Sequence, residues 1–329
     1  MLDVKIIAKA EFDSPPGSRR KDSMIDPKSL MAIKNLELRA RVVVEGFWNG
    51  LHRSPYHGFS VEFTEYRQYT PGDDPRYLDW RLYARSDRYY IKKFEDETNL
   101  RCHLLVDNSR SMGYGSLAYT KAQYANTLAA TLAYFLYLQG DAVGVLTFDE
   151  QIREYLPARH RTGHLRHVML ALEKPAAGAA TDLTAPLKRI VEMVRKRALM
   201  VLISDLLAPI ETLGKNLTSL GACGHEVVLF HVLDPVELSF SFDKDALFHD
   251  IESGRDLYID PAAARKDYLQ RLADHCAAAQ AACQKLGIGY YRFGTDRPLE
   301  LALFDFLRER MHGGRKVKRT AARQRTSAS

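Results

Sequence analysis

The sequence predicts an α/β fold in which an open, mostly parallel β-sheet is covered by helices on both faces. Two observations lead to this prediction. Between residues 100 and 293, short and almost purely apolar runs alternate with longer helical segments. Such runs are typical of parallel strands that are buried on both faces, and their alternation with helices favours a doubly wound sheet.

The predicted elements follow one another along the chain. Five strands are expected, at 102–106, 143–148, 199–204, 227–232 and 288–293. Helices are expected at 28–44, 118–138, 184–197 and 261–286, the second of them apolar on most sides. The stretch 246–260 has a Ser-Gly turn between two strand-like pieces and predicts an inserted hairpin.

The chain divides into four predicted segments. Residues 1–27 form a flexible lead that several prolines interrupt. Residues 28–98 hold a helix and a small β-rich element, because the stretch 60–97 alternates apolar and polar residues around a Pro-Gly-Asp-Asp turn. Residues 99–311 form the α/β domain, and residues 312–329 form a basic disordered tail.

The composition is that of a soluble globular protein. Of the 329 residues, 46% are hydrophobic and 27% are charged. The four cysteines are far apart and form no C-x-x-C pair, which argues against a disulfide framework and fits a reducing compartment. The longest apolar stretch, 127–138, is shorter than the roughly 20 residues that a membrane span needs. The N-terminus has no sustained apolar core like that of a signal peptide, so we expect a cytoplasmic protein.

The formal net charge of +6 comes from the C-terminal tail. Six basic residues and no acidic residue lie between His312 and Ser329, so the rest of the chain is formally neutral. A basic tail can bind nucleic acid, but a disordered solubilising end is the favoured interpretation. Nucleic acid is therefore not expected as a partner of the folded body, and a tail-driven nucleic-acid function is the weakest alternative.

Three loops at the predicted edge of the sheet carry oxygen-bearing side chains. The stretch LLVDNSRS supplies Asp107, Ser109 and Ser111 directly after the first strand. The stretch LISD supplies Asp205 directly after the strand at 199–204, and GAATDLTAPL supplies Thr181 in the loop before a helix. Ligands of open α/β sheets bind outside the carboxyl ends of the strands, so we expect these loops to meet at one edge.

These residue types match the ligands of a hard cation. Mg²⁺ prefers oxygen ligands and keeps several waters, and two aspartates balance its charge. Asp-x-Ser-x-Ser alone also forms turns and helix caps. A serine-hydrolase site would need a G-x-S-x-G elbow, which the motif lacks. Asp107 as a phosphoryl-transfer nucleophile would need a second aspartate two residues on, where Ser109 stands.

The constellation D-x-S-x-S at 107–111, with Thr181 and Asp205, resembles the metal-ion-dependent adhesion site of von Willebrand factor A-type domains. The flanking stretch EYRQYTPGDDPRYLDWRLYARSDRYYIKKFEDETNLRCHLLVDNSRSM resembles the bacterial family called domain of unknown function 58. The stretches GDAVGVLTF, TDL, LISDLL and GHEVVLFHVLDP agree with that family in the same order, over about residues 40–312.

The resemblance implies a von Willebrand factor A-like α/β domain, preceded by a small β-rich element, that binds Mg²⁺ or Mn²⁺. Ser109 and Ser111 would coordinate the ion directly, Thr181 directly or through water, and Asp107 and Asp205 largely through water. An acidic side chain of a partner would take the open position. Ala180 departs from the family pattern, where glycine is expected before the threonine.

The resemblance also implies a partner. Members of the family are encoded beside MoxR-type AAA+ ATPases and are thought to act with them in chaperone-like or assembly roles. We therefore expect a non-enzymatic, metal-dependent protein interaction module. The alternative is a magnesium-dependent hydrolase or phosphatase that uses the same strand edge. The three ligand loops contain no histidine or lysine to act as a general base, which favours binding over catalysis.

Overall fold

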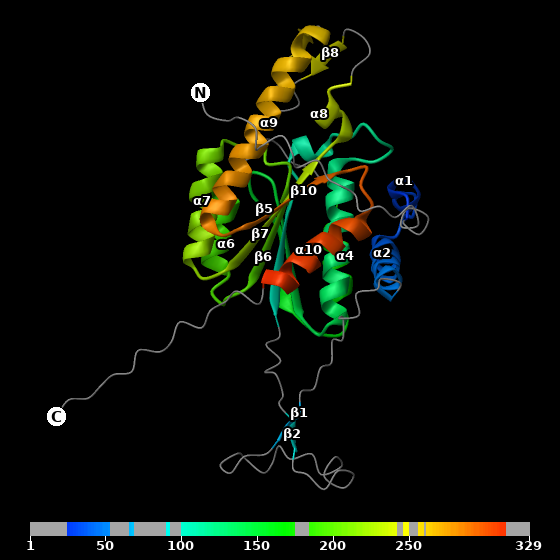
Figure 1. Cartoon of the computed structure of the whole chain (residues 1–329), viewed down its shortest axis with the longest axis vertical. Helices are drawn as coiled ribbons and strands as arrows, with labels where there is room; N and C mark the ends of the chain where they lie inside the picture. The colour runs from blue at the N-terminus through cyan, green and yellow to red at the C-terminus, as the bar shows by residue number, and fades with distance from the viewer. Residues whose placement is uncertain are drawn as a thin grey trace, which may run out of the picture.

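The main body is a six-stranded β-sheet between two layers of helices (Figure 1). The structure, a computed structural model, describes residues 25–52, 66–68, 90–92, 100–174, 184–241, 246–249, 256–259 and 261–313. The sheet consists of β3 (Arg101–Asp107), β4 (Ala142–Phe148), β5 (Ile152–Arg159), β6 (Leu199–Ser204), β7 (Glu226–Leu233) and β10 (Gly289–Gly294). The five strands predicted from the sequence are confirmed.

The strand order is β10-β7-β6-β3-β4-β5, and all neighbours pair in parallel except β4 and β5. The chain builds outward from β3 through β4 and β5, and in the other direction from β6 through β7 and β10. This doubly wound order confirms the predicted α/β architecture of an open, mostly parallel sheet covered by helices. Its topological switch point lies between β3 and β6, where Val106 pairs with Ile203.

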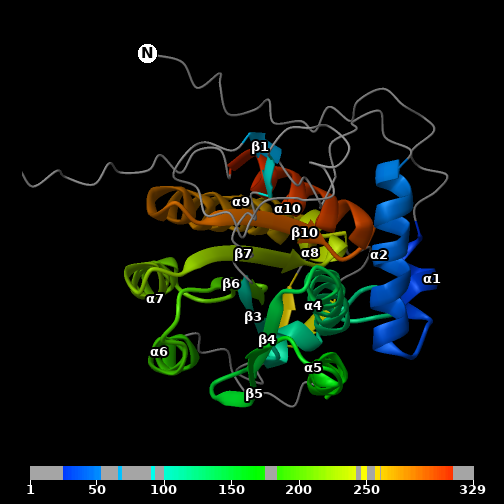
Figure 2. The same cartoon turned by 90° about the horizontal axis from the view of Figure 1, so that it is seen from below.

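Side chains of the strands alternate between two hydrophobic cores, one on each face of the sheet. In β3, Leu104 and Val106 belong to one core and Leu105 belongs to the other. The first core lies beneath α2 (Leu36–His52), α4 (Lys121–Leu138), α5 (His164–Leu172) and α10 (Leu299–Gly313). The second lies beneath α6 (Thr184–Met193), α7 (Ile210–Ala222) and α9 (Pro261–Leu286), so the helices cover both faces (Figure 2).

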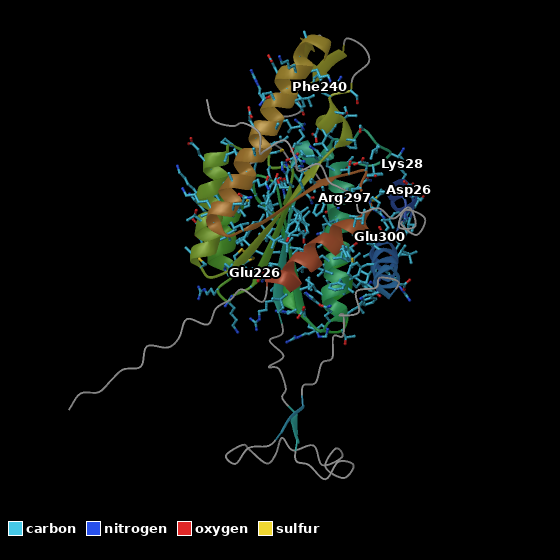
Figure 3. The ribbon with its side chains drawn as sticks, viewed as in Figure 1. Asp26, Lys28, Glu226, Phe240, Arg297 and Glu300 are labelled. Atoms are coloured by element: carbon cyan, nitrogen blue, oxygen red, sulfur yellow. The ribbon has the colours of Figure 1, made fainter. Side chains whose placement is uncertain are left out.

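The helix predicted at 28–44 is in fact two helices, α1 (Pro27–Met31) and α2. The side chain of Asp26 caps α1 by accepting a hydrogen bond from the N–H of Ser29 at 3.0 Å (Figure 3). Asn35 caps α2 in the same way. Because each of these caps starts a new helix by pairing with its free N–H groups, the helical segment is interrupted between α1 and α2.

Helix α2 shares the core of the main domain. Val43, Val44 and Phe47 are buried, and the ring of Phe47 packs edge to face on Phe135 of α4 with 5.8 Å between centroids. The segment predicted as a separate 28–98 unit is therefore joined to the α/β domain by apolar packing, at least along α2. The boundaries of the four predicted segments stay a prediction.

Two other helices differ from their predicted ends. Helix α4 begins at Lys121 instead of 118, because Thr120 and Gln123 form a capping box there. Helix α6 ends at Met193, four residues earlier than predicted, since the chain must turn before it enters β6. Helix α9 has the predicted bounds.

Strand β5 and helices α7 and α10 were not predicted from the sequence. Strand β5 lies antiparallel at the edge of the sheet and is mostly half-exposed, so it lacks a purely apolar run. Pro157 interrupts the pairing of β5 with β4 between Val143 and Val145, as prolines do at edge strands and bulges. Gly144 faces this irregularity, and a Cβ there would lie 2.6 Å from the backbone N of Ala158.

Strands β8 (Ala246–His249) and β9 (Asp256–Ile259) pair antiparallel and confirm the predicted hairpin. Strands β1 (Tyr66–Gln68) and β2 (Tyr90–Lys92) form another antiparallel pair within the segment predicted to be β-rich. The rest of that segment, the N-terminal lead up to residue 24 and residues 314–329 of the basic tail lie outside the described residues. Within the parts of the chain that the structure describes, no helix is long and apolar enough to cross a membrane.

Candidate functional site

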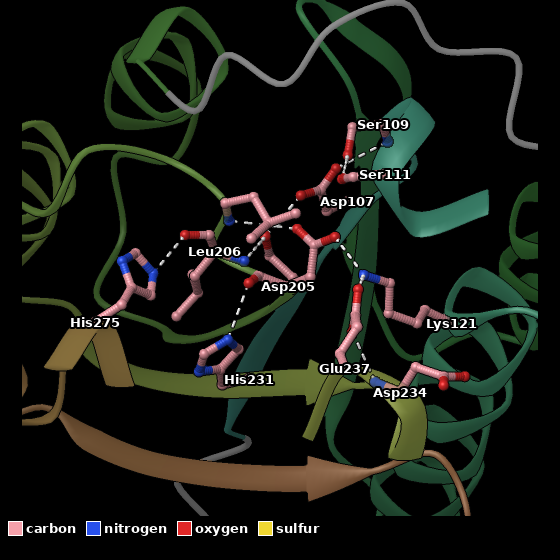
Figure 4. A network of polar contacts seen from close by, with 12 residues as sticks. Asp107, Ser109, Ser111, Lys121, Asp205, Leu206, His231, Asp234, Glu237 and His275 are labelled. Atoms are coloured by element: carbon pink, nitrogen blue, oxygen red, sulfur yellow. Dashed lines mark hydrogen bonds and ion pairs between the residues drawn. The ribbon is translucent and has the colours of Figure 1, made fainter. Parts of the chain in front are cut away.

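Asp107, Ser109 and Ser111 lie together at the carboxyl end of β3 (Figure 4). Asp107 is the last residue of the strand, and the chain then forms a short 3-10 helix, η3 (Arg110–Gly113). Asp107 and Ser109 are fully buried, and Ser111 is 6% exposed. The Oγ atoms of Ser109 and Ser111 are 3.1 Å apart, so the two hydroxyls point to the same place.

The carboxylate of Asp107 is held by hydrogen bonds from the loop after β3 and from β6. Its Oδ1 accepts from the N–H of Ser109 at 2.8 Å, and its Oδ2 accepts from the hydroxyl of Ser204 in β6 at 2.6 Å. Burial and the neighbouring Asp205 carboxylate raise the pKa of Asp107 to about 7, although the hydrogen bonds oppose this shift. Two buried carboxylates at this edge therefore make it a place where a positive charge is favourable.

Asp205 follows β6 directly and is fully buried at the same edge. Its Oδ2 accepts a hydrogen bond from the Nζ of Lys121 at 2.9 Å, and Lys121 also donates to Oε1 of Glu237 at 2.6 Å. Lys121 is only 1% exposed. Burial alone would lower the pKa of Lys121, but the two carboxylates together outweigh it and raise that pKa, so the ammonium stays charged.

The turn after Asp205 is strained and held from several sides. Leu206 has a left-handed backbone with φ of 53°, which costs a non-glycine residue about 1–2 kcal/mol. Its N–H donates to the hydroxyl of Ser204 at 3.0 Å, and its carbonyl accepts from Nε2 of His275 at 3.1 Å. His231 donates from Nε2 to the carbonyl of Asp205 at 2.9 Å. These contacts fix the turn that presents Asp205.

His231 is a neutral, fully engaged side chain. Burial lowers the pKa of His231 to about 4. Because the carbonyl of Asp205 can only accept, Nε2 carries the proton, and Nδ1 accepts from the hydroxyl of Tyr290 at 2.7 Å. Both ring nitrogens are thus in use.

Glu237 is positioned by α8 (Pro235–Ser239), a short helix after β7. Asp234 caps this helix by accepting from the N–H of Val236 at 2.8 Å, and Glu237 accepts from the N–H of Asp234 at 2.8 Å in return. Ser116 binds the same carboxylate of Asp234 through its N–H at 2.9 Å and its hydroxyl at 2.5 Å. The loop between η3 and α4 is thereby tied to the end of β7.

The structure brings four of the five predicted ligands to one edge: Asp107, Ser109, Ser111 and Asp205. Thr181, with Ala180 beside it, lies outside the described residues. The three ligand loops indeed hold no histidine or lysine, but Lys121 and His231 reach Asp205 from α4 and β7. A lysine and a histidine therefore lie beside Asp205 although neither belongs to a ligand loop.

Lys121, Glu237 and Ser204 were not predicted as site residues from the sequence. Lys121 is the first residue of α4, at the positive end of the helix dipole, where a cation is unfavourable, but a helix predicted to begin at 118 does not reveal this position. Ser204 was counted as a strand residue, although its hydroxyl joins Asp107 to the turn at Leu206. Glu237 carried no sequence signal, because its role depends on how β7 ends beside β6.

The donor chemistry of the edge fits a hard divalent cation. The candidate ligands within the described residues are two carboxylates and two hydroxyls, all oxygen donors, as Mg²⁺ and Mn²⁺ prefer. Within the same part of the chain, no three His, Cys, Asp or Glu side chains gather into a metal-binding group.

Fold and site together define an α/β domain with a buried, oxygen-rich site at its topological switch point. The chain belongs to the family described as "Protein of unknown function DUF58", whose model matches residues 65–278. Among curated proteins it is similar to "Uncharacterized protein Rv1480" of Mycobacterium tuberculosis, with 30% identity over 305 residues, 91% of this chain and 95% of that protein. A second relative, "Uncharacterized protein MAV169" of Mycobacterium avium, is 28% identical over 157 residues, 47% of this chain and 91% of that protein.

Solved structures with some likeness include the conserved hypothetical protein BatB from Bacteroides thetaiotaomicron. That match has a TM-score of 0.44 and 13% identity, and it covers 65% of this chain and 99% of that chain. Another is the SpRpn10 VWA domain, with a TM-score of 0.36 and 13% identity over 63% of this chain and 94% of that one. The fold assignment rests on the strand order described above.

Proposed function

We propose that this chain is a metal-dependent protein interaction module whose partner is a MoxR-type AAA+ ATPase, in a chaperone-like or assembly role in the cytoplasm. The observation that supports this proposal is the meeting of Asp107, Asp205 and the paired hydroxyls of Ser109 and Ser111 at the switch point. The identity of the ATPase follows from the family resemblance.

In this proposal the edge holds Mg²⁺ or Mn²⁺ through oxygen ligands. Ser109 and Ser111 would coordinate the ion, with Asp107 and Asp205 behind them and Thr181 completing the set. When bound, the ion supplies a positive centre that attracts an acidic side chain of the partner. Ser204 and the two histidines orient the carboxylates, because they fix Asp107 and the turn at Asp205.

The alternative is a magnesium-dependent hydrolase or phosphatase. Contacts of Lys121 and His231 with Asp205 favour it, because such groups can serve as acid, base or anion-binding residues. Their engagement favours binding instead: Lys121 is paired with two carboxylates, and His231 is bonded through both nitrogens. Hydrolysis of p-nitrophenyl phosphate that Asp107→Asn abolishes would support the alternative.

Calorimetric titration of the chelator-treated full chain with MgCl₂ and MnCl₂ tests the metal site. We expect saturable binding in the wild type and its loss in the double variant Asp107→Ala, Ser109→Ala. Asp149→Asn is the matched control, because Asp149 is also a buried carboxylate, directly after the neighbouring strand β4. Its Oδ2 pairs with Nε of Arg153 at 2.6 Å. Unchanged binding by a folded double variant, verified by circular dichroism, would refute the site.

Capture of the purified ATPase by the immobilised chain tests the partner. We expect capture in Mg²⁺ and its loss in excess chelator, with the same loss in the Asp107→Ala, Ser109→Ala variant. Capture that is equal with and without chelator would remove the ion from the interface.

A further inference from the structure

Lys121 breaks two local rules at once. It is the first residue of α4, where the helix dipole disfavours a cation, and its side chain is 1% exposed, where an ammonium is strongly disfavoured unless it is paired. The ammonium is paired with two carboxylates, since Nζ lies 2.9 Å from Asp205 and 2.6 Å from Glu237. The same Nζ lies 5.9 Å from the centroid of the Tyr114 ring. Residues that violate local preference without an evident local gain tend to serve a function.

The charges at this edge also give Lys121 a role. When all three carboxylates are ionised, Asp107, Asp205 and Glu237 contribute three negative charges and Lys121 one positive charge, so two negative charges remain. Asp205 is the shared member: its Oδ2 is bonded to the ammonium at 2.9 Å, whereas its Oδ1 receives a long hydrogen bond of 3.4 Å from the N–H of Leu207. A second cation that draws on Asp205 must therefore share this carboxylate with Lys121.

We propose that Lys121 is a resident cation of this site, which holds Asp205 in place and competes with a divalent ion for the Oδ2 atom of Asp205. The inference rests on the proposed metal function and names a residue that sets the affinity. It also explains the position of Glu237. The ammonium of Lys121 stays hydrogen-bonded to Glu237 when a metal ion binds Asp205.

Two substitutions separate competition from simple net charge. Lys121→Met removes the ammonium and keeps an unbranched side chain that is one atom shorter, leaving three negative charges. The double variant Lys121→Met, Glu237→Gln leaves two negative charges, as in the wild type, but it frees Asp205 from its partner. The glutamine still accepts the hydrogen bond from the N–H of Asp234, so the cap of α8 is retained.

Calorimetric titration of the full chain with MgCl₂ and with MnCl₂ is the test, with the thermal midpoint measured in chelator and in metal. We expect both variants to bind roughly tenfold more tightly than the wild type, because a neighbouring positive charge has been removed. We also expect metal to raise their midpoints more than that of the wild type. Lys174→Met, at an exposed lysine that pairs with Glu154, should bind like the wild type.

Each outcome decides between the two proposals. If the double variant binds like the wild type while the single variant binds more tightly, net charge alone sets the affinity and the competition is refuted. If both variants bind like the wild type, Lys121 has no part in the site, while the metal function stands. If the wild type binds no metal but the variants do, Lys121 occupies the site and the metal function of the wild type fails. If no protein binds metal, both proposals fall.

Discussion

Ser204 joins the two halves of the candidate site, and its removal is a sharp test of that geometry. Its hydroxyl donates to Asp107 at 2.6 Å and accepts from the N–H of Leu206 at 3.0 Å, and the residue is fully buried. In Ser204→Ala both hydrogen bonds are lost. Because the position is fully buried, solvent water does not replace the hydroxyl. A hydrogen bond to a charged group contributes roughly 1.5–3 kcal/mol, and a buried N–H left unpaired costs roughly 1–3 kcal/mol. We expect a loss of about 3 kcal/mol in the free energy of unfolding.

Urea unfolding followed by circular dichroism, in chelator, measures this loss. Thermal unfolding should show a midpoint lower by roughly 6–12 °C, since 1 kcal/mol shifts a domain of this size by about 2–4 °C. Ser219→Ala is the matched control, because Ser219 lies exposed on α7 and bonds only its own helix at 3.1 Å. A loss below about 0.5 kcal/mol in Ser204→Ala, in the range of ordinary surface substitutions, would refute the bridging role of the hydroxyl.

Three further predictions concern the framework of the site. Burial and the positive charges of His225 and Arg101 lower the pKa of His103 to about 4. Between pH 4 and 6.5, His103 is therefore protonated in the unfolded chain but neutral in the folded protein. The free energy of unfolding should therefore fall by about 3 kcal/mol as the pH drops through that range. In His103→Leu the urea midpoint should change less with pH over the same range, and parallel profiles of the variant and the wild type would contradict this prediction. In Gly144→Ala the new Cβ would lie 2.6 Å from a backbone nitrogen of β5, so we expect a loss of about 1–3 kcal/mol in urea unfolding, and an unchanged midpoint would show that β5 yields freely. Gly214→Ala, on α7 with no atom within 4 Å of the new Cβ, should instead gain up to about 1 kcal/mol, and a lower thermal midpoint would be the contrary result.

The central strands could be predicted from the sequence because their burial on both faces leaves an unmistakable apolar run. The same logic located Asp107 and Asp205, since residues that follow parallel strands must lie at one edge. Edge strand β5 escaped prediction for the opposite reason: it is half-exposed, contains Pro157 and pairs irregularly. Patterns of burial thus predict the interior of this sheet better than its border.

The partners of the candidate ligands could not be predicted in the same way. Lys121 contacts Asp205, 84 positions away, and Glu237, 116 positions away, and neither spacing has a periodicity that a sequence reveals. Ser204 stood one residue before Asp205, but its use as a bridge depends on the register of β3 and β6. Strand order and register, once known, explain these contacts; composition and motif spacing do not.

The long sequence separations within the Lys121 cluster affect when the site can form. The ion pairs of Lys121 close loops of 84 and 116 residues, so they require β3, β6 and β7 to be assembled and α8 to be capped. Contacts of such high separation form late, because their chain entropy is lost before they contribute. During synthesis the complete Lys121 cluster cannot form until Glu237 has emerged and β7 has paired with β6. The intact Lys121 cluster therefore reports that β3, β6 and β7 have assembled in their native order.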